Sequence, residues 1–159
     1  QNEDGCETLV MKGLESVRSD WTELAKSFQT RLLHLIFAGQ DCQSYIEEKI
    51  QKLKAGELDQ QLVYHKRIRQ HLDKYTKTTP PQIKAARSAN NLYGYEKYQK
   101  GSRIAYVMGL RGPEEVGLCK TPIDYEHYLS KQLLPIAESL LVNYSKTQVS
   151  PFDRQIPLL

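Results

Sequence analysis

Residues 62–75 read LVYHKRIRQHLDKY, a short apolar and aromatic run that carries four lysines and arginines. Residues 62–68 predict a short strand, and residues 70–75 predict one or two helical turns. The basic character continues along the chain, because ten lysines and arginines lie between residues 62 and 106 with only two acidic residues. This stretch therefore carries a net charge of +8, whereas the rest of the chain sums to −5.

Six of the ten tyrosines lie in the same basic stretch, residues 62–106. Lysine and arginine displace counterions from a phosphate backbone, and aromatic rings interleaved with them pack on sugars or bases. The pattern is compatible with nucleic-acid binding. It is equally compatible with a well-solvated basic surface, because clustered cations alone are unspecific.

Two helices are predicted before the basic stretch. Asp20 is the expected N-cap of the first, and apolar residues then recur at helical spacing until Gly39. The second covers about residues 43–55 and ends at Gly56. Residues 8–18 look like an entry strand that is too short to form a sheet alone, so we expect it to belong to a larger sheet.

Three further elements are predicted after residue 75. A helix begins at Pro80-Pro81 with Thr79 as its cap and gives way to a loop over residues 90–102. A strand follows over 104–108, and glycines and a proline predict turns and a flexible loop between residues 109 and 117.

The last predicted helix runs from about residue 123 to 143, and Pro135 should kink or split it near Leu134. Residues 146–159 read as a disordered tail with an apolar end. The chain is therefore expected to be mainly α-helical with little sheet.

Composition narrows the class of protein. The chain has 159 residues and a mass of 18.3 kDa, the size of one domain with a tail. No apolar run approaches the roughly 20 residues of a membrane span, and the polar start QNEDGCET is unlike a signal peptide. The three cysteines are too far apart for a CxxC zinc site or a disulfide framework, which favours a reducing, cytosolic compartment.

Catalytic motifs are weak in this sequence. Asp124, Glu126 and His127 lie together in DYEHY, but side chains two positions apart on a helix diverge, and Asp124 is better placed as a helix cap. Motifs for nucleotide binding or nucleophilic hydrolysis are missing. We therefore expect no catalytic residue and no metal ligand here, and a binding domain is favoured over a small enzyme using Asp124, Glu126 and His127.

Five ordered segments resemble the C-terminal part of family B DNA polymerases, and most closely that of a bacterial member. They are KGLESVRSDW at 12–21, LVYHKRIRQHLDKY at 62–75, PPQIKAAR at 80–87, KGSRIAYVM at 100–108 and PIDYEHYLSKQLLPIAESLL at 122–141. The first is similar to the family's KGxExxRRDW element, with Ser19 where a second arginine is common. The resemblance covers nearly all of residues 9–144.

The resemblance implies an α+β thumb domain, mostly helical with a small β-sheet insertion. Residues 1–20 would be the end of the palm, with its entry strand, residues 21–145 the thumb, and residues 146–159 a flexible tail. The family's catalytic aspartates lie upstream, so this segment alone is expected to be inactive and to hold no cofactor, whereas the parent polymerase would use Mg²⁺. A cytoplasmic, nucleoid-associated bacterial enzyme is implied.

The resemblance also implies which residues contact primer–template duplex DNA, through phosphates and without reading sequence. The expected contacts are Lys66, Arg67, Arg69, Lys84, Arg87, Arg103, Tyr106, Lys12 and Arg18. Core packing is a close alternative for Tyr106, and core packing is favoured for Tyr125 and Tyr128. Lys12 and Arg18 have an alternative as well, because either can pair with Glu15 or Asp20.

The C-terminal pentapeptide is similar to the peptide that bacterial polymerases insert into the sliding clamp. Gln155 would be its polar anchor, and Ile156, Leu158 and Leu159 its apolar side chains, with Leu159 in place of the usual phenylalanine. An arbitrary frayed end is the alternative. The expected partners are therefore duplex DNA, the sliding clamp and the other polymerase domains, with no membrane. A freestanding basic, tyrosine-rich nucleic-acid-binding module remains the alternative to the polymerase thumb.

Overall fold

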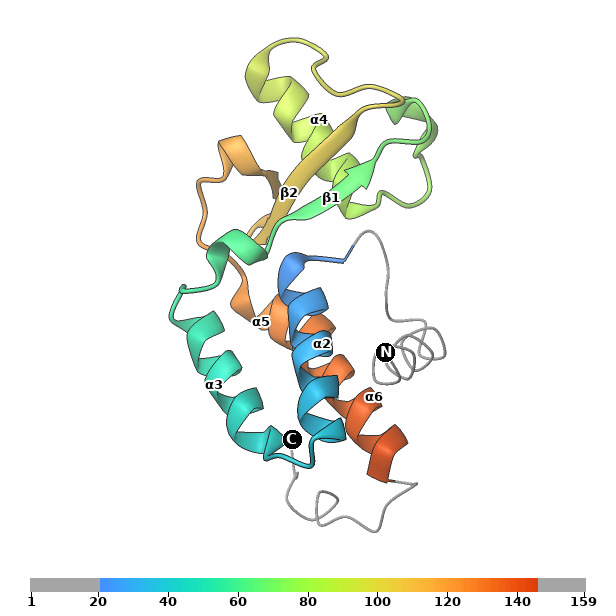
Figure 1. Ribbon diagram of the computed structural model, residues 1–159. Coiled ribbons are helices and arrows are strands. Elements are labelled where there is room, and N and C mark those ends of the chain that lie inside the picture. The colour runs from blue at the N-terminus through green and yellow to red at the C-terminus, as the bar shows by residue number, and fades with distance from the viewer. Residues whose placement is uncertain (1–20, 146–159) are drawn as a thin grey trace. The chain divides into compact units, whose positions relative to one another are not determined.

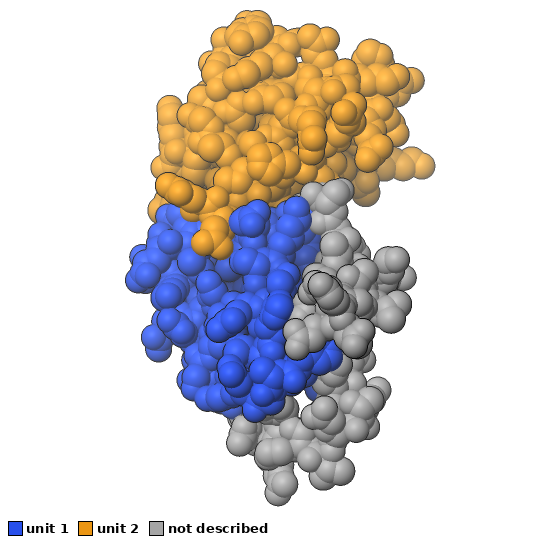
Figure 2. Space-filling model, viewed as in Figure 1, with its two compact units in different colours: residues 1–59, 125–159 blue, residues 60–124 orange. Residues whose placement is uncertain are grey.

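The structure is a computed structural model that describes residues 21–145. The expected entry strand, Lys12, Arg18 and the clamp-like residues 155–159 all lie outside these described residues. The described residues divide into two compact units (Figure 2), one formed by residues 21–59 and 125–145 and the other by residues 60–124. Residues 60–124 are thus an insertion, and the single domain expected over 21–145 consists of two units.

The first unit is helical (Figure 1). It contains α2 (Glu23–Phe37), α3 (Cys42–Lys54), the short α5 (Tyr125–Tyr128), a π-helical turn (Leu129–Leu133) and α6 (Leu134–Ser145). Its apolar stripes pack against one another, since α2 buries Leu24, Phe28 and Leu32 next to α6. Tyr128 is completely buried, which confirms the core role predicted for it.

Helix α2 begins at Glu23, two residues later than predicted. Its N-cap is Thr22, whose hydroxyl accepts a hydrogen bond from the backbone N–H of Ala25 at 3.2 Å. The prediction of Asp20 as the cap is therefore wrong, and Asp20 itself lies outside the described residues. The same hydroxyl donates to Gln132 Oε1 at 2.6 Å, so the cap also holds the π-helical turn.

The interruption predicted near Leu134 is confirmed. Pro135 has no N–H to donate to the carbonyl oxygen four residues earlier, and the turn just before it, Leu129–Leu133, widens to π-helical geometry. Gln132 lies in this turn and is 6% exposed. The bond from Thr22 therefore fixes a buried amide in the turn where this C-terminal helix changes from α-helical to π-helical geometry.

We expect Thr22→Val to lower the free energy of unfolding of the helical unit by about 2 kcal/mol, because it removes a helix cap and a buried hydrogen bond at unchanged volume. The fluorescence of Trp21, the only tryptophan, reports urea unfolding of this unit. Thr22→Ser is the matched control, since it keeps the hydroxyl. A loss in Thr22→Val no larger than that in Thr22→Ser would show that the hydroxyl contributes no more to stability than the methyl group.

The second unit is a three-stranded antiparallel sheet covered by one helix. Strands β1 (Tyr64–Arg67), β2 (Arg103–Gly109) and β3 (Gly112–Glu115) follow one another in the order β1-β2-β3, and α4 (Pro81–Tyr93) packs on one face (Figure 1). Short 3₁₀ turns lie at Asp59–Gln61, Leu72–Lys74 and Val116–Leu118. The core between sheet and helix consists of Ile68, Ile83, Ala85, Ala86, Ile104 and Tyr106.

Helix α4 differs from its prediction at both ends. Its N-cap is Pro80, not Thr79, and proline occupies the first turn as expected. The helix continues to Tyr93, four residues into the predicted loop, and ends at Gly94 with a φ of 84°, a left-handed conformation that favours glycine. The mainly helical fold with a small inserted sheet is confirmed.

Strand β3 was not predicted, because its sequence Gly-Pro-Glu-Glu lacks the residues that favour strands. Pro113 is tolerated there because β3 is an edge strand, with only β2 beside it. None of the helices in residues 21–145 combines the length and the hydropathy needed to cross a membrane.

Candidate nucleic-acid interface

One face of the sheet carries exposed cations. Side chains alternate along β1, so that His65 and Arg67 are exposed on one face while Tyr64 and Lys66 are half-buried on the other. In the antiparallel register Arg67 lies directly opposite Arg103, which is also exposed. The fold thus brings together two arginines that are 36 residues apart in the sequence.

Two like charges in a directly opposed cross-strand pair destabilise a sheet. Over the described residues, neither guanidinium forms an ion pair or a side-chain hydrogen bond, whereas Lys52 is paired with Glu48 and Lys97 with Glu115. The Arg67–Arg103 pair therefore has an intrinsic electrostatic cost that a bound anion would remove.

The other predicted cations are spread over the sheet unit. Arg69 is exposed just after the buried Ile68, and Lys84 is exposed on α4 near the N-terminal end of that helix. Lys66 is half-buried beside Ile104, on the face that packs against the core. Among the described residues, Arg67 and Arg103 are thus the only two predicted DNA contacts that the strand register places opposite each other.

Arg87 has a structural role inside the sheet unit. Its Nη2 donates to the carbonyl oxygens of Leu72 at 2.6 Å and Tyr75 at 3.0 Å, which ties the 3₁₀ turn to α4. Sequence reasoning did not anticipate these bonds, because the carbonyl groups lie 15 and 12 residues away. Its remaining N–H groups stay available, since a guanidinium has five donors.

Most tyrosines of the basic stretch are used inside the unit. Tyr106 is 3% exposed and stacks on Tyr64 with ring centroids 5.1 Å apart, so the structure favours the core-packing alternative for Tyr106 over DNA contact. Tyr93 and Tyr98 bond to a buried carboxylate. Tyr95 differs from them, because 61% of its surface is exposed.

That carboxylate belongs to Glu115, the last residue of β3, which is 6% exposed. Tyr93 Oη donates to its Oε1 at 3.0 Å, and Tyr98 Oη makes a short hydrogen bond to its Oε2. The backbone N–H of Gly117 donates to Oε1 at 3.1 Å, and Lys97 Nζ lies 3.6 Å from Oε2. We call this cluster of Tyr93, Lys97, Tyr98 and Glu115 the Glu115 latch.

The latch shifts the ionisation of its members. Burial opposes the charge on Glu115, but the hydrogen bonds from Tyr98 and Tyr93 and the charge of Lys97 outweigh it, so the pKa of Glu115 lies below its ordinary value. Burial, followed by the bond to Glu115, raises the pKa of Tyr98. The ammonium group of Lys97 also lies 4.3 Å from the Tyr93 ring centroid. Lys97 is therefore held as a structural cation.

The alternative of acid–base chemistry at Asp124, Glu126 and His127 gains no support from the structure. Within residues 21–145 no three His, Cys, Asp or Glu side chains are grouped so that they could hold a metal ion. Tyr125 is half-buried and donates from its hydroxyl to Asp59 Oδ1 at 2.8 Å, so it joins two segments of the helical unit.

Comparison with known proteins identifies the family to which this chain belongs. The sequence model of DNA polymerase family B matches residues 1–144, so the chain belongs to that family. It is 47% identical over 137 residues to DNA polymerase II of Escherichia coli, covering 84% of this chain and 18% of that protein. A DNA polymerase of Desulfurococcus is 32% identical over 152 residues, covering 87% and 19%.

A solved structure is similar as well. The family B DNA polymerase of the archaeon Pyrobaculum calidifontis matches with a TM-score of 0.63 at 26% identity, covering 76% of this chain and 18% of that one. The chain therefore spans about a fifth of the length of each of these three polymerases.

Proposed function

We propose that this chain is the thumb region of a DNA polymerase II-like enzyme of bacterial replication or repair, and that it grips duplex DNA through backbone phosphates. Family membership supports the parent activity, a DNA-directed DNA polymerase in the cytoplasm. Residues 1–20 would be the end of the palm and residues 21–145 the thumb. Chemistry belongs to domains outside this chain, so the chain alone is inactive.

The observation that carries the duplex contact is the exposed, directly opposed pair of Arg67 and Arg103. A phosphate between two guanidinium groups relieves their repulsion and is neutralised by charge-assisted hydrogen bonds. Arg69 and Lys84 add exposed cations to the same unit. Such contacts position a duplex without reading bases, which suits an enzyme that copies any sequence.

Mg²⁺ in the parent enzyme would be bound by the family's catalytic aspartates, which lie in the palm upstream of this chain. When bound, it would supply charge neutralisation during phosphoryl transfer. The role left to this chain is to hold the duplex product in place, together with the palm.

We expect the double variant Arg67→Ala/Arg103→Ala to weaken binding to duplex DNA of any sequence and to flatten its salt dependence. Removal of two phosphate contacts lowers the slope of log K against log salt by about 2. Fluorescence anisotropy of a labelled blunt duplex over a salt series measures both quantities. The charge reversal Lys66→Glu/Arg67→Glu should act in the same direction.

Lys52→Ala is the matched control, because Lys52 pairs with Glu48 at 3.2 Å on α3. For Lys52→Ala the slope of log K against log salt should equal that of the unchanged chain. An unchanged slope in the double arginine variant would remove Arg67 and Arg103 from the interface.

We also propose that Gln155, Ile156, Leu158 and Leu159 dock on the sliding clamp. The support is the similarity of this terminal sequence to clamp-binding peptides, in which a polar anchor and apolar side chains fill a preformed groove. Docking on a ring would hold the polymerase on DNA while leaving it free to slide.

A further inference from the structure

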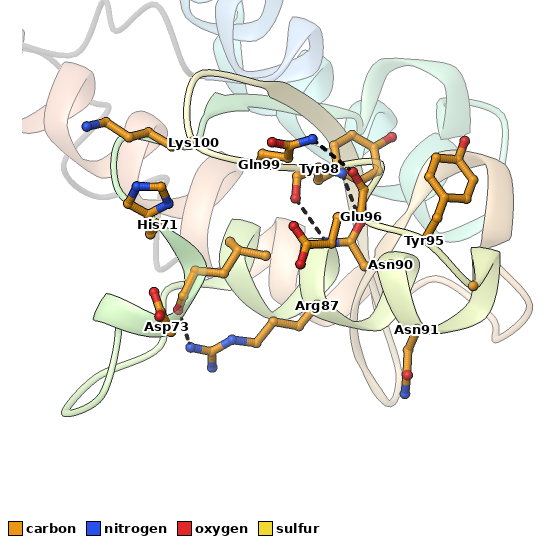
Figure 3. A pocket seen from close by; sticks show the side chains of 12 residues that line it. His71, Asp73, Arg87, Asn90, Asn91, Tyr95, Glu96, Tyr98, Gln99 and Lys100 are labelled. Atoms are coloured by element: carbon orange, nitrogen blue, oxygen red, sulfur yellow. Dashed lines mark hydrogen bonds between the residues drawn. The ribbon is translucent and has the colours of Figure 1, made fainter.

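The sheet unit contains a polar cavity whose lining does not include Arg67 or Arg103. Its volume is about 660 Å³, and it lies between the 3₁₀ turn Leu72–Lys74, the exposed side of α4 and the loop after it (Figure 3). Cavities of 300–1,000 Å³ are the usual size for sites that bind small molecules. A single nucleotide therefore fits its dimensions.

Two sets of hydrogen bonds fix the walls of this cavity. The Asn90 side chain pairs with the backbone of Tyr98, accepting from its N–H at 2.9 Å and donating to its carbonyl oxygen at 2.9 Å. On the other wall, Arg87 holds the carbonyl groups of Leu72 and Tyr75. The cavity is thus preformed, which reduces the entropic cost of binding a ligand.

An aromatic ring stands at the rim of the cavity. Tyr95 lies at one side in Figure 3 and is 61% exposed, which is unusual for a large ring in this unit. Its centroid is 6.1 Å from that of Tyr93, whose hydroxyl is anchored to Glu115 by the latch. The exposed Tyr95 ring is therefore packed beside the Tyr93 ring, which the latch holds in place.

The remaining lining offers both signs of charge and amide groups. Asn91 and Gln99 supply amides to the lining, while Lys100 and Arg87 supply cations and Glu96 a carboxylate (Figure 3). Amide and carboxylate groups match the donors and acceptors on the edge of an unpaired base. The cations match its phosphate. In a duplex those base edges are already paired and the faces are stacked.

We propose that this cavity binds one unpaired nucleotide of a single-stranded nucleic acid. The base stacks on Tyr95, and the amide and charged groups of the lining bond to its edge and its phosphate. The lining of this site does not include Arg67 or Arg103. The site gives this unit a preference for a duplex with an unpaired overhang over a blunt duplex.

The test is an NMR titration of the isotope-labelled 159-residue chain with short oligo(dT), blunt duplex and inorganic phosphate. Oligo(dT) should shift the signals of Asn91, Tyr95 and Gln99, and phosphate alone should not. Tyr95→Ala should weaken oligo(dT) binding at least about fivefold, the effect of losing one base–aromatic stack. Tyr95→Phe should retain it.

Leu92→Ala is the matched control, because Leu92 is 62% exposed near the end of α4 but does not line the cavity. Equal weakening by Leu92→Ala and Tyr95→Ala would overturn the proposal. So would identical shifts with inorganic phosphate, which would indicate an anion site only.

The double variant Arg67→Ala/Arg103→Ala separates this inference from the proposed function. Retained oligo(dT) binding with lost duplex binding supports two distinct sites. Loss of both oligo(dT) binding and duplex binding would show that oligo(dT) binds through the arginine pair. That result would contradict the cavity proposal and leave the proposed duplex contact unchanged. Retained duplex binding with unchanged oligo(dT) shifts would contradict the proposed function alone.

Discussion

Glu115→Ala should lower the free energy of unfolding of the sheet unit by about 3 kcal/mol, because it leaves two tyrosine hydroxyls and a lysine without the buried carboxylate that they share. The latch joins the end of β3 to the end of α4 and to the loop that precedes β2. The methyl NMR signals of Ile83 and Ile104, both buried in this unit, report its urea unfolding directly.

Glu96→Ala is the matched control, since Glu96 is exposed in the same loop and only its backbone carbonyl accepts a bond, from Gln99 Nε2 at 3.2 Å. We expect it to change stability by less than about 0.5 kcal/mol. A loss in Glu115→Ala no larger than this would show that the latch contributes nothing to stability.

The latch also has a pH signature of known sign. The pKa of Glu115 is lower in the folded chain than its ordinary value, so its contribution is complete above that value and is lost as the pH falls through the folded pKa. The unchanged chain should therefore lose stability on acidification more steeply than Glu115→Gln. Parallel stability curves for the two proteins below about pH 4.5 would contradict this account.

The elements that could be predicted are those whose signals are local. The apolar period of α2 and α3, their terminal glycines and the interruption at Pro135 all follow from residues within a few positions of one another. Thr22 was missed as the cap because Asp20, followed three residues later by an acid, also fits the capping pattern. What distinguishes Thr22 from Asp20 is its hydrogen bond to Gln132, which lies 110 residues further along the chain.

The pairings across the sheet unit could not be predicted, because they join residues far apart in the sequence. Strand β3 forms from a Gly-Pro-Glu-Glu segment only because β2 offers it a partner. The basic stretch indicated an anion-binding surface. That Arg67 and Arg103 lie opposite each other becomes visible only in the register between β1 and β2. The tyrosines that suggested stacking on bases are mostly internal, and Tyr95 is distinguished from them only by its exposure.

Deletion of residues 155–159 should abolish binding of this chain to the sliding clamp and leave its binding to duplex DNA unchanged. The expected loss is complete because a short peptide concentrates its affinity in a few apolar anchors and one polar contact. None of the expected DNA contacts lies in the pentapeptide, so DNA affinity should not respond to its deletion. Surface plasmon resonance on immobilised clamp, with duplex anisotropy in parallel, measures both.

A graded series tests the chemistry of the peptide. Leu159→Phe restores the aromatic residue usual in such peptides and should tighten clamp binding, because a larger apolar group fills more of the groove. Gln155→Ala should weaken it by removing the polar anchor. The matched control is Phe152→Ala, three residues upstream of the pentapeptide, which should have little effect. Clamp binding that survives the deletion would assign docking to another surface of the chain, and the terminal peptide would then be an ordinary chain end.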